Sequence, residues 1–336
     1  MRCVVFGTRS FDESSLREAN IGAGHELTFI QENLSERTAG LSAGHEAACL
    51  VVGDSGSALV LETLKAQGIR GLVLRSAGFN HVDLEAAARL ELPVLRVPAY
   101  SPYSVAEHAV ALLLTLNRRV HRAYNRVREF NFAIEGLMGQ DLHGQTVGVV
   151  GLGHIGLAFA RIMLGFGCRV LGYDPAPSEE ARALPITFVD KETLFRESFV
   201  VSLHCPLLPS THHFVGQAEL DLMPAGSFLI NTSRGAVIDH RALIKCLKTG
   251  RLGGVGLDVY EEEEGVFFRD LSDKVLTDDQ LVRLMSFPQV LITGHQGFFT
   301  RQAVTAIAET TIRNLDGLAS GQWDPANEVH PAAHLA

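Results

Sequence analysis

The stretch VGVVGLGHIG, residues 147–156, places three valines before a glycine-rich turn and the start of an apolar helix. Its glycines fit the pattern GxGxxG, which is weak alone but typical of dinucleotide binding between a strand and a helix. Gly151 would permit the tight turn, Gly153 would let the backbone approach a pyrophosphate, and Gly156 would let the helix pack closely. The stretch therefore predicts a strand–turn–helix unit that binds phosphate.

The surrounding residues complete this signature. The N–H groups around His154 and Ile155, at the start of the helix, would face the phosphates. Asp174 ends the next apolar run, RVLGYD, 23 residues after Gly151 (174 − 151 = 23), where an acid can accept hydrogen bonds from ribose hydroxyls. Its charge would repel a 2′-phosphate, and no arginine follows in DPAPSEEA, so NAD is favoured over NADP. The alternative is a turn residue before Pro175.

Length and composition set the class of protein. A chain of 336 residues predicts two domains, and 46% hydrophobic with 20% charged residues is an ordinary globular composition. The net charge of −9 argues against a nucleic-acid partner. No apolar run approaches the roughly 20 residues of a membrane span, so no membrane partner is expected.

Cysteine and histidine usage predicts no disulfide framework and no metal site. The five cysteines are odd in number and lack CxxC spacing, which indicates reduced, mostly buried thiols of a cytoplasmic protein. No HxH or HxxxH ligand pair on one predicted element suggests a metal. The nearest candidate is His212 with His213, and we expect these neighbours to point in different directions from a surface loop.

Apolar and amphipathic segments alternate along both halves of the chain, which predicts α/β architecture with parallel sheets. A single long helix is expected over residues 103–130, after a first-turn proline at Pro102. The acidic segment 261–280 is expected to be a surface loop. The predicted strands cover residues 3–6, 27–30, 48–52, 71–74 and 94–97, then those in TVGVVG, RVLGYD, FVVSLHCP, SFLINTS and GGVGLDV, before a terminal helix in 309–322.

Three charged or titratable groups follow apolar strands in the second half. Arg234 follows SFLINTS, Asp258 and a run of glutamates follow GGVGL, and His295 follows LITG. Carboxyl ends of parallel strands meet at one edge of a sheet, so these groups should converge. An arginine can grip the carboxylate of an α-keto acid, and a histidine oriented by a glutamate can protonate its reduced ketone. Taken singly, the arginine could be a cap, the glutamates a solvated run and the histidine structural.

The chain resembles the NAD-dependent D-2-hydroxyacid dehydrogenase family over essentially its whole length. The acidic excursion and the GHQ sequence, where many relatives have proline before the histidine, resemble the lactate branch of that family. The stretches that carry the resemblance are LRSAGFNHVDL, RVPAYSPYSVAEHA, TLNRRVHRAYNR, VGLGHIG, GYDP, SLHCPL, NTSRGAVID, GLDVYEEE, EEEEGVFFRD and TGHQGFF.

This resemblance implies a role for each matching residue. Arg234 would bind the substrate, His295 would be the acid/base, and Glu263 would be its partner, with Glu262 or Glu264 left open within the run of four. The implied cofactor contacts, besides the glycine turn and Asp174, are Cys205, Pro206, Thr211, Thr232, Ser233 and Asp258, the last to the nicotinamide carboxamide. The implied substrate contacts, besides Arg234 and His295, are the backbone of Ser76, Ala77 and Gly78, with Tyr100 and Phe298 around the pocket.

The resemblance also implies the organisation and the activity. Residues 1–100 and 297–336 would form a flavodoxin-like substrate domain, into which a Rossmann-like NAD-binding domain, residues 101–296, is inserted. The helix from Tyr103 would form a homodimer, or part of a homotetramer. The implied reaction is the reversible reduction of pyruvate to D-lactate by NADH. The alternatives are another 2-keto acid (hydroxypyruvate, glyoxylate, phenylpyruvate or 2-ketoisocaproate), or an NAD-sensing regulatory protein.

Overall fold

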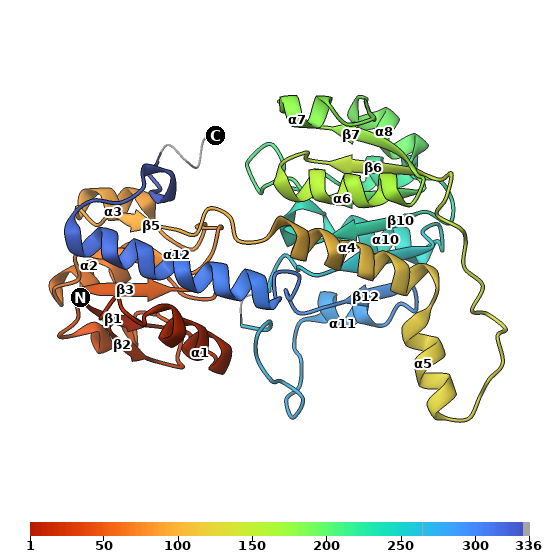
Figure 1. The fold of residues 1–336 in the computed structure, drawn as a ribbon. Coiled ribbons are helices and arrows are strands. Elements are labelled where there is room, and N and C mark those ends of the chain that lie inside the picture. The colour runs from red at the N-terminus through yellow and green to blue at the C-terminus, as the bar shows by residue number, and fades with distance from the viewer. Residues whose placement is uncertain (264, 332–336) are drawn as a thin grey trace. The chain divides into compact units, whose positions relative to one another are not determined.

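The computed structural model describes residues 1–263 and 265–331, and the chain divides into two compact units (Figure 1). Unit 1 combines Met1–Ser101 with Phe299–Ala336, and unit 2 is Pro102–Phe298. Unit 2 begins one residue later and ends two residues later than the predicted inserted domain. Both units are α/β, each with one sheet of parallel strands. The predicted fold class is confirmed.

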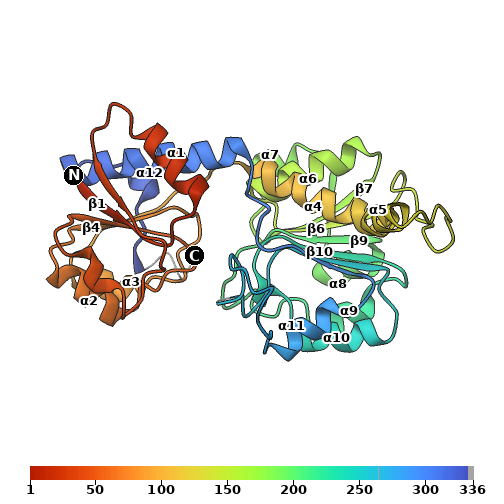
Figure 2. The ribbon, with the colours of Figure 1, turned by 90° about the horizontal axis from the view of Figure 1, so that it is seen from below.

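Unit 1 is built on a five-stranded parallel sheet with the order β2-β1-β3-β4-β5. Successive residues of β1 face opposite sides, so Cys3 and Val5 pack with α1 and α12, whereas Val4 and Phe6 pack with α2 and α3 (Figure 2). The elements are β1 (Arg2–Val5), α1 (Ser10–Ala19), β2 (Glu26–Phe29), β3 (Ala47–Leu50), α2 (Ala58–Ala66), β4 (Gly71–Leu74), α3 (Leu84–Arg89), β5 (Val94–Leu95) and α12 (Arg301–Ser320).

Unit 2 is built on a seven-stranded parallel sheet with the order β12-β11-β10-β9-β6-β7-β8. In Figure 2, α4 and α6 cover one face and α8 to α11 the other. The short strand β8 was not predicted. The elements are α4 (Pro102–Asn117), α5 (Val120–Arg128), β6 (Thr146–Val150), α6 (His154–Gly165), β7 (Arg169–Tyr173), α7 (Glu179–Arg182), β8 (Ile186–Phe188), α8 (Lys191–Glu197), β9 (Val200–Leu203), α9 (Gln217–Leu222), β10 (Phe228–Asn231), α10 (His240–Lys248), β11 (Gly254–Leu257), α11 (Asp279–Met285) and β12 (Val290–Ile292).

The direction of strand addition reverses beside β6. The chain passes from β6 to β7 and β8 on one side, and then continues through β9 to β12 on the other. In open α/β sheets, ligands bind beyond the carboxyl ends of the strands at such a reversal. The turns after β6, β9, β10, β11 and β12 therefore lie at the edge where a ligand is expected.

The predicted single helix over residues 103–130 is wrong, because the chain forms two helices. Arg119 has a φ of 50°, in the left-handed region, and stands between α4 and α5. Apolar side chains of α4, among them Leu112 and Leu116, are buried against the sheet, whereas α5 has no buried residue. The left-handed Arg119 turns the chain, and the large apolar side chains of α5, such as Tyr124 and Val127, stay exposed instead of packing on the sheet.

The terminal helix α12 extends from Arg301 to Ser320, so it begins eight residues before the predicted segment (309 − 301 = 8). Within the described residues, none of the helices combines the length and hydrophobicity needed to cross a bilayer. The acidic segment 261–280 is irregular where the structure describes it, until α11 begins at Asp279.

Candidate active site

The glycine turn after β6 is as tight as its sequence predicts. Gly151 has a φ of 86°, and a Cβ there would lie 2.7 Å from the backbone nitrogen of Cys205. A Cβ on Gly156 would lie 1.9 Å from the carbonyl oxygen of Gly151, so the helix can begin here only with glycine at this position. A Cβ on Gly153 would meet nothing within 4 Å. The backbone of Gly153 is therefore open to an approaching ligand.

Asp174 closes two turns at once. One carboxylate oxygen accepts the N–H of Leu152, in the glycine turn, at 2.7 Å. The other accepts the N–H of Ala176 at 2.9 Å and closes a turn that contains Pro175. Asp174 therefore acts as a turn residue, and the same carboxylate is tied to the predicted phosphate-binding loop; its contact with a ribose stays a prediction.

The residues after β9 and β10 fit a bound dinucleotide. The hydroxyl of Thr232 is buried and has no hydrogen-bond partner among the described residues. Such an orphaned polar group, at the same edge of the sheet as the open glycine turn and the first turn of α6, suits a ligand rich in hydrogen-bonding atoms. The hydroxyl of Thr211 instead donates to the carbonyl of Pro206 at 2.6 Å and shapes the loop after β9. Burial raises the pKa of the Cys205 thiol to about 11, so it remains neutral.

Arg234 is positioned by a buried asparagine that the sequence analysis missed. Asn231, the last residue of β10, is fully buried. Its side chain accepts the N–H and the hydroxyl of Ser233, at 3.0 and 2.8 Å, and donates to the carbonyl of Arg234 at 2.8 Å. The Arg234 guanidinium donates to the Ser233 carbonyl at 2.7 Å. In the sequence, the indication of this role was that the polar Asn231 ends an otherwise apolar strand.

The turn that carries Arg234 packs directly on the turn after β11. A Cβ on Gly235 would lie 2.0 Å from the carbonyl carbon of Tyr260 and 2.3 Å from the nitrogen of Glu261. The two backbones can approach this closely only because Gly235 has no side chain. The arginine turn and the glutamate run are therefore neighbours, as their places after adjacent strands predict.

His295 is paired with Glu263. Its Nδ1 lies 3.0 Å from Glu263 Oε1, and the two side chains are only 19% and 23% exposed. The Nε2 atom has no hydrogen-bond partner among the described residues. Glu262, one of the two alternatives, is exposed, and Glu264 lies outside the described residues.

The backbone of His295 is held in an unusual conformation. Its φ is 55°, in the left-handed region that costs a non-glycine residue about 1–2 kcal/mol. The N–H of His295 donates to the carbonyl of Asp258 at 2.8 Å. The carboxylate of Asp258 accepts the next two N–H groups, from Gln296 at 2.9 Å and Gly297 at 2.7 Å. Asp258 thus fixes the backbone at His295 and at the two residues that follow it.

Asp258 is in turn supported by two residues that sequence reasoning missed. The Thr293 hydroxyl donates to its carboxylate at 2.5 Å, and His108 Nε2 lies 3.2 Å from the same oxygen. Burial raises the pKa of Asp258, but the hydrogen bonds from His108 and Thr293 outweigh it, and the net pKa is below the usual range. In the sequence, the only indication of this role was that His108 stands among the apolar residues of α4. The predicted contact of Asp258 with a carboxamide stays a prediction.

The segment from Ser76 to Gly78 lies in unit 1, after β4. Its carbonyls are occupied, because the Ser76 hydroxyl donates to Gly78 at 2.7 Å and Arg96 donates to Ala77 at 2.9 Å. None of the described residues accepts a hydrogen bond from the three N–H groups of this segment. The segment is therefore a candidate for binding an anion. Tyr100 in unit 1 and Phe298 in unit 2 are both half-buried.

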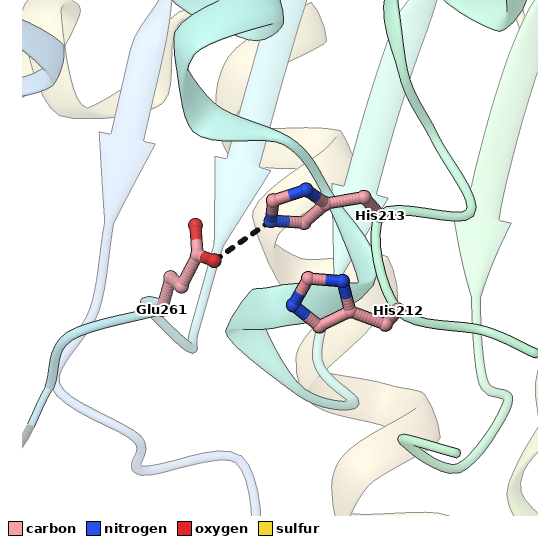
Figure 3. Close-up of side chains that lie close together, drawn as sticks. All are labelled: His212, His213 and Glu261. Carbon is pink, nitrogen blue, oxygen red and sulfur yellow. Dashed lines mark hydrogen bonds and ion pairs between the residues drawn. The ribbon is translucent and has the colours of Figure 1, made fainter. Parts of the chain in front are cut away.

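The prediction that His212 and His213 point in different directions is wrong. Their rings stack with centroids 4.0 Å apart and planes inclined by 27°. His213 has a φ of 51°, and this left-handed residue turns the chain so that neighbouring side chains project to the same side. Figure 3 shows both rings beside Glu261.

Gly235 offers a test of the contact between the two turns. Gly235→Ala should lower the free energy of unfolding by about 2 kcal/mol or more, because two backbones must separate to admit the methyl group. Gly165→Ala is the matched control, since a Cβ there meets nothing within 4 Å. Urea denaturation measures both variants. Equal stability of the two would show that the turns are not packed as described.

Comparison with known proteins identifies the family. The family model for the D-isomer specific 2-hydroxyacid dehydrogenase, NAD binding domain, matches residues 110–297. The chain is 48% identical to D-lactate dehydrogenase of Escherichia coli (strain K12), over 98% of this chain and 100% of the relative. It is 46% identical to D-lactate dehydrogenase kk1H of Curvularia clavata, over 96% of this chain and 93% of the relative.

Solved structures agree with these relatives. The apo-structure of D-lactate dehydrogenase from Escherichia coli matches with a TM-score of 0.89 and 47% identity, covering 98% of this chain and 100% of that one. D-lactate dehydrogenase from Aquifex aeolicus, complexed with NAD and lactic acid, matches with a TM-score of 0.87 and 30% identity, covering 97% and 98%. The chain therefore belongs to the D-isomer specific 2-hydroxyacid dehydrogenases, and unit 2 carries the NAD-binding domain of that family.

Proposed function

We propose that the chain catalyses the reversible reduction of pyruvate to D-lactate with NADH. The observation that carries the proposal is the His295–Glu263 pair, in which Nδ1 is held at 3.0 Å and Nε2 has no partner among the described residues. The relatives named D-lactate dehydrogenase in Escherichia coli and Curvularia clavata support pyruvate as the substrate.

His295 acts as the proton donor and acceptor of the reaction. With its Nδ1–H donated to Glu263, the imidazole directs Nε2 toward the reacting oxygen. In the reduction, the imidazolium gives the Nε2 proton to the ketone oxygen as that oxygen gains negative charge. In the oxidation, Nε2 accepts the hydroxyl proton. The negative charge of Glu263 stabilises the imidazolium in both directions.

Arg234 holds the substrate carboxylate. Its guanidinium has five N–H donors, and one of them donates to the Ser233 carbonyl. Two of the remaining N–H groups can make a bidentate contact with a carboxylate. The same positive charge polarises the ketone next to that carboxylate. The N–H groups of Ser76, Ala77 and Gly78, together with Tyr100 and Phe298, are the further substrate contacts that we assign.

The cofactor is assigned to the carboxyl edge of the unit 2 sheet. Bound NADH supplies the hydride, and the protein supplies position and charge. The N–H groups of His154 and Ile155 would face its phosphates, and Asp174 would accept hydrogen bonds from its ribose. Asp258 would accept a hydrogen bond from its carboxamide. The remaining contacts that we assign are Gly151, Gly153, Gly156, Cys205, Pro206, Thr211, Thr232 and Ser233.

The proposed roles of His295 and Arg234 predict different effects of their substitution on kcat and on the KM for pyruvate. His295→Ala should lower kcat with pyruvate by about 10²- to 10⁴-fold, the usual worth of a positioned acid/base, and leave NADH affinity nearly unchanged. Arg234→Lys should chiefly raise KM for pyruvate, because a lysine cannot make the paired contact. Steady-state kinetics, with fluorescence titration of NADH, measures both variants.

A panel of 2-keto acids separates the alternatives in the same assay. Pyruvate should give the highest kcat/KM, above hydroxypyruvate, glyoxylate, phenylpyruvate and 2-ketoisocaproate. A higher value for another acid would reassign the substrate. The absence of NADH oxidation with all of them would favour an NAD-sensing protein. Equal losses of turnover and NADH affinity in His295→Ala would contradict the role of His295.

Asp174 predicts the choice between NADH and NADPH. Asp174→Asn keeps an oxygen for the Leu152 N–H but removes the charge, so it should chiefly relax the discrimination against NADPH. Asp174→Ala should also weaken NADH about tenfold or more, because hydrogen bonds to a charged group contribute about 1.5–3 kcal/mol each. Binding titrations with both nucleotides measure this. Equal use of NADH and NADPH by the unaltered protein would contradict the assignment.

We further infer that the chain forms homodimers or homotetramers. The segment from α5 to residue 138 exposes an unusual set of large apolar side chains, which is typical of an interface: Tyr124, Val127, Phe130, Phe132, Ile134 and Met138. Tyr103, on α4, is exposed as well. The five free, buried cysteines fit the reducing conditions of the cytoplasm.

Light scattering after size-exclusion chromatography tests the assembly. The double variant Phe130→Asp, Phe132→Asp should lower the mass of the particle, because charge replaces apolar surface at the interface. Val275→Asp, on an equally exposed apolar residue elsewhere in unit 2, is the control and should leave the mass unchanged. A monomeric unaltered protein would refute the inference.

A further inference from the structure

A second cluster of chemically reactive side chains consists of residues that were not assigned to catalysis. His212, His213 and Glu261 each offer one ligand atom, and these atoms all lie within 4.8 Å of one another. The two histidines belong to the loop between β9 and α9, and Glu261 follows β11. Figure 3 shows a nitrogen of each ring on the side that faces the Glu261 carboxylate. We propose that this His212–His213–Glu261 cluster is a binding site for a divalent transition-metal ion of the zinc type.

The donor set selects the kind of ion. Two imidazole nitrogens and one carboxylate oxygen suit zinc and its neighbours, whereas magnesium and calcium prefer sites made of oxygen atoms. The carboxylates of Glu262 and Glu263 follow Glu261 in the chain and add negative charge near the site. Three protein ligands leave a fourth tetrahedral position for water or another small ligand.

The distances are compatible with a tetrahedral ion after small movements. Ligand atoms at about 2.0–2.1 Å from zinc lie about 3.3 Å from one another. The His213 Nε2 atom is 2.7 Å from Glu261 Oε1, which is a hydrogen-bond distance. Binding a metal between them requires this pair to separate by a few tenths of an ångström. The ligand atoms that are farther apart, up to 4.8 Å, must move closer together.

Hydrogen bonds to neighbouring residues already orient Glu261 and His213. Glu261 Oε2 lies 3.4 Å from Nδ1 of His240, a fully buried residue at the start of α10. Metal-binding carboxylates are commonly oriented by such a second hydrogen bond. His213 is anchored by its N–H, which donates to the Ala236 carbonyl at 2.8 Å.

The backbone also prepares the site. Side chains of neighbouring residues in an extended loop project to opposite sides, and they could not share one ion. The left-handed φ of 51° at His213 brings the two rings into a stack instead. His212 is exposed, so an ion can reach the cluster from solvent. Bound metal would join the loop after β9 to the turn that carries both Glu261 and Glu263.

Calorimetric titration of the full chain, stripped of metal with a chelator, tests this proposal. We expect one Zn²⁺ per chain and no comparable binding of Mg²⁺. His212→Ala removes an exposed ligand and should weaken Zn²⁺ binding tenfold or more. His143→Ala removes another exposed histidine of unit 2, outside the cluster, and should leave the affinity unchanged.

Cobalt provides a second readout. Co²⁺ bound by nitrogen and oxygen ligands in four-coordinate geometry gives intense visible absorption, which Zn²⁺ should abolish and Glu261→Gln should prevent. Zn²⁺ binding of unchanged affinity in His212→Ala would place the ion elsewhere, for example at His295 with Glu263, and would overturn the proposal. The lack of a one-to-one Zn²⁺ complex in the unaltered protein would overturn it as well.

Discussion

The structure depends on one buried carboxylate, that of Asp258. It is 1% exposed and accepts hydrogen bonds from Thr293, Gln296 and Gly297, with His108 beside it. A buried charge is tolerated only when it is well paired, and this one uses its partners to hold the segment around His295. The strained backbone of the histidine persists because the surrounding hydrogen bonds determine it. A substitution of Asp258 would therefore alter the position of the His295 imidazole.

The parallel sheet of unit 2 explains why the remaining groups gather near this carboxylate. Strands β10, β11 and β12 are neighbours, so Arg234, the glutamate run and His295 emerge at one edge. Gly235 lets the arginine turn lie against Tyr260, and Glu263 reaches His295 from the same turn. The glycine turn after β6 lies farther along this edge. One sheet thus presents the glycine turn and the His295–Glu263 pair at the same edge of the unit.

Much of this arrangement could be predicted from the sequence, for identifiable reasons. The glycine spacing at 151–156 and the apolar strands predict the parallel sheet, because each depends on local backbone preferences. The groups after the strands could be predicted because topology brings strand ends together. Asn231, Thr293 and His108 were missed, since their roles depend on hydrogen bonds between segments far apart in the chain. The break at Arg119 and the stacking of His212 on His213 were predicted wrongly, because left-handed residues other than glycine leave little trace in a sequence.

The most direct test of the central claim is a crystal structure of the chain with NAD and oxamate, an unreactive analogue of pyruvate. The account predicts that the Arg234 guanidinium makes two hydrogen bonds to the oxamate carboxylate. It also predicts that His295 Nε2 lies within hydrogen-bond distance of the oxygen that takes the place of the ketone. A complex in which Arg234 and His295 face separate cavities, with oxamate bound to only one of them, would contradict the account.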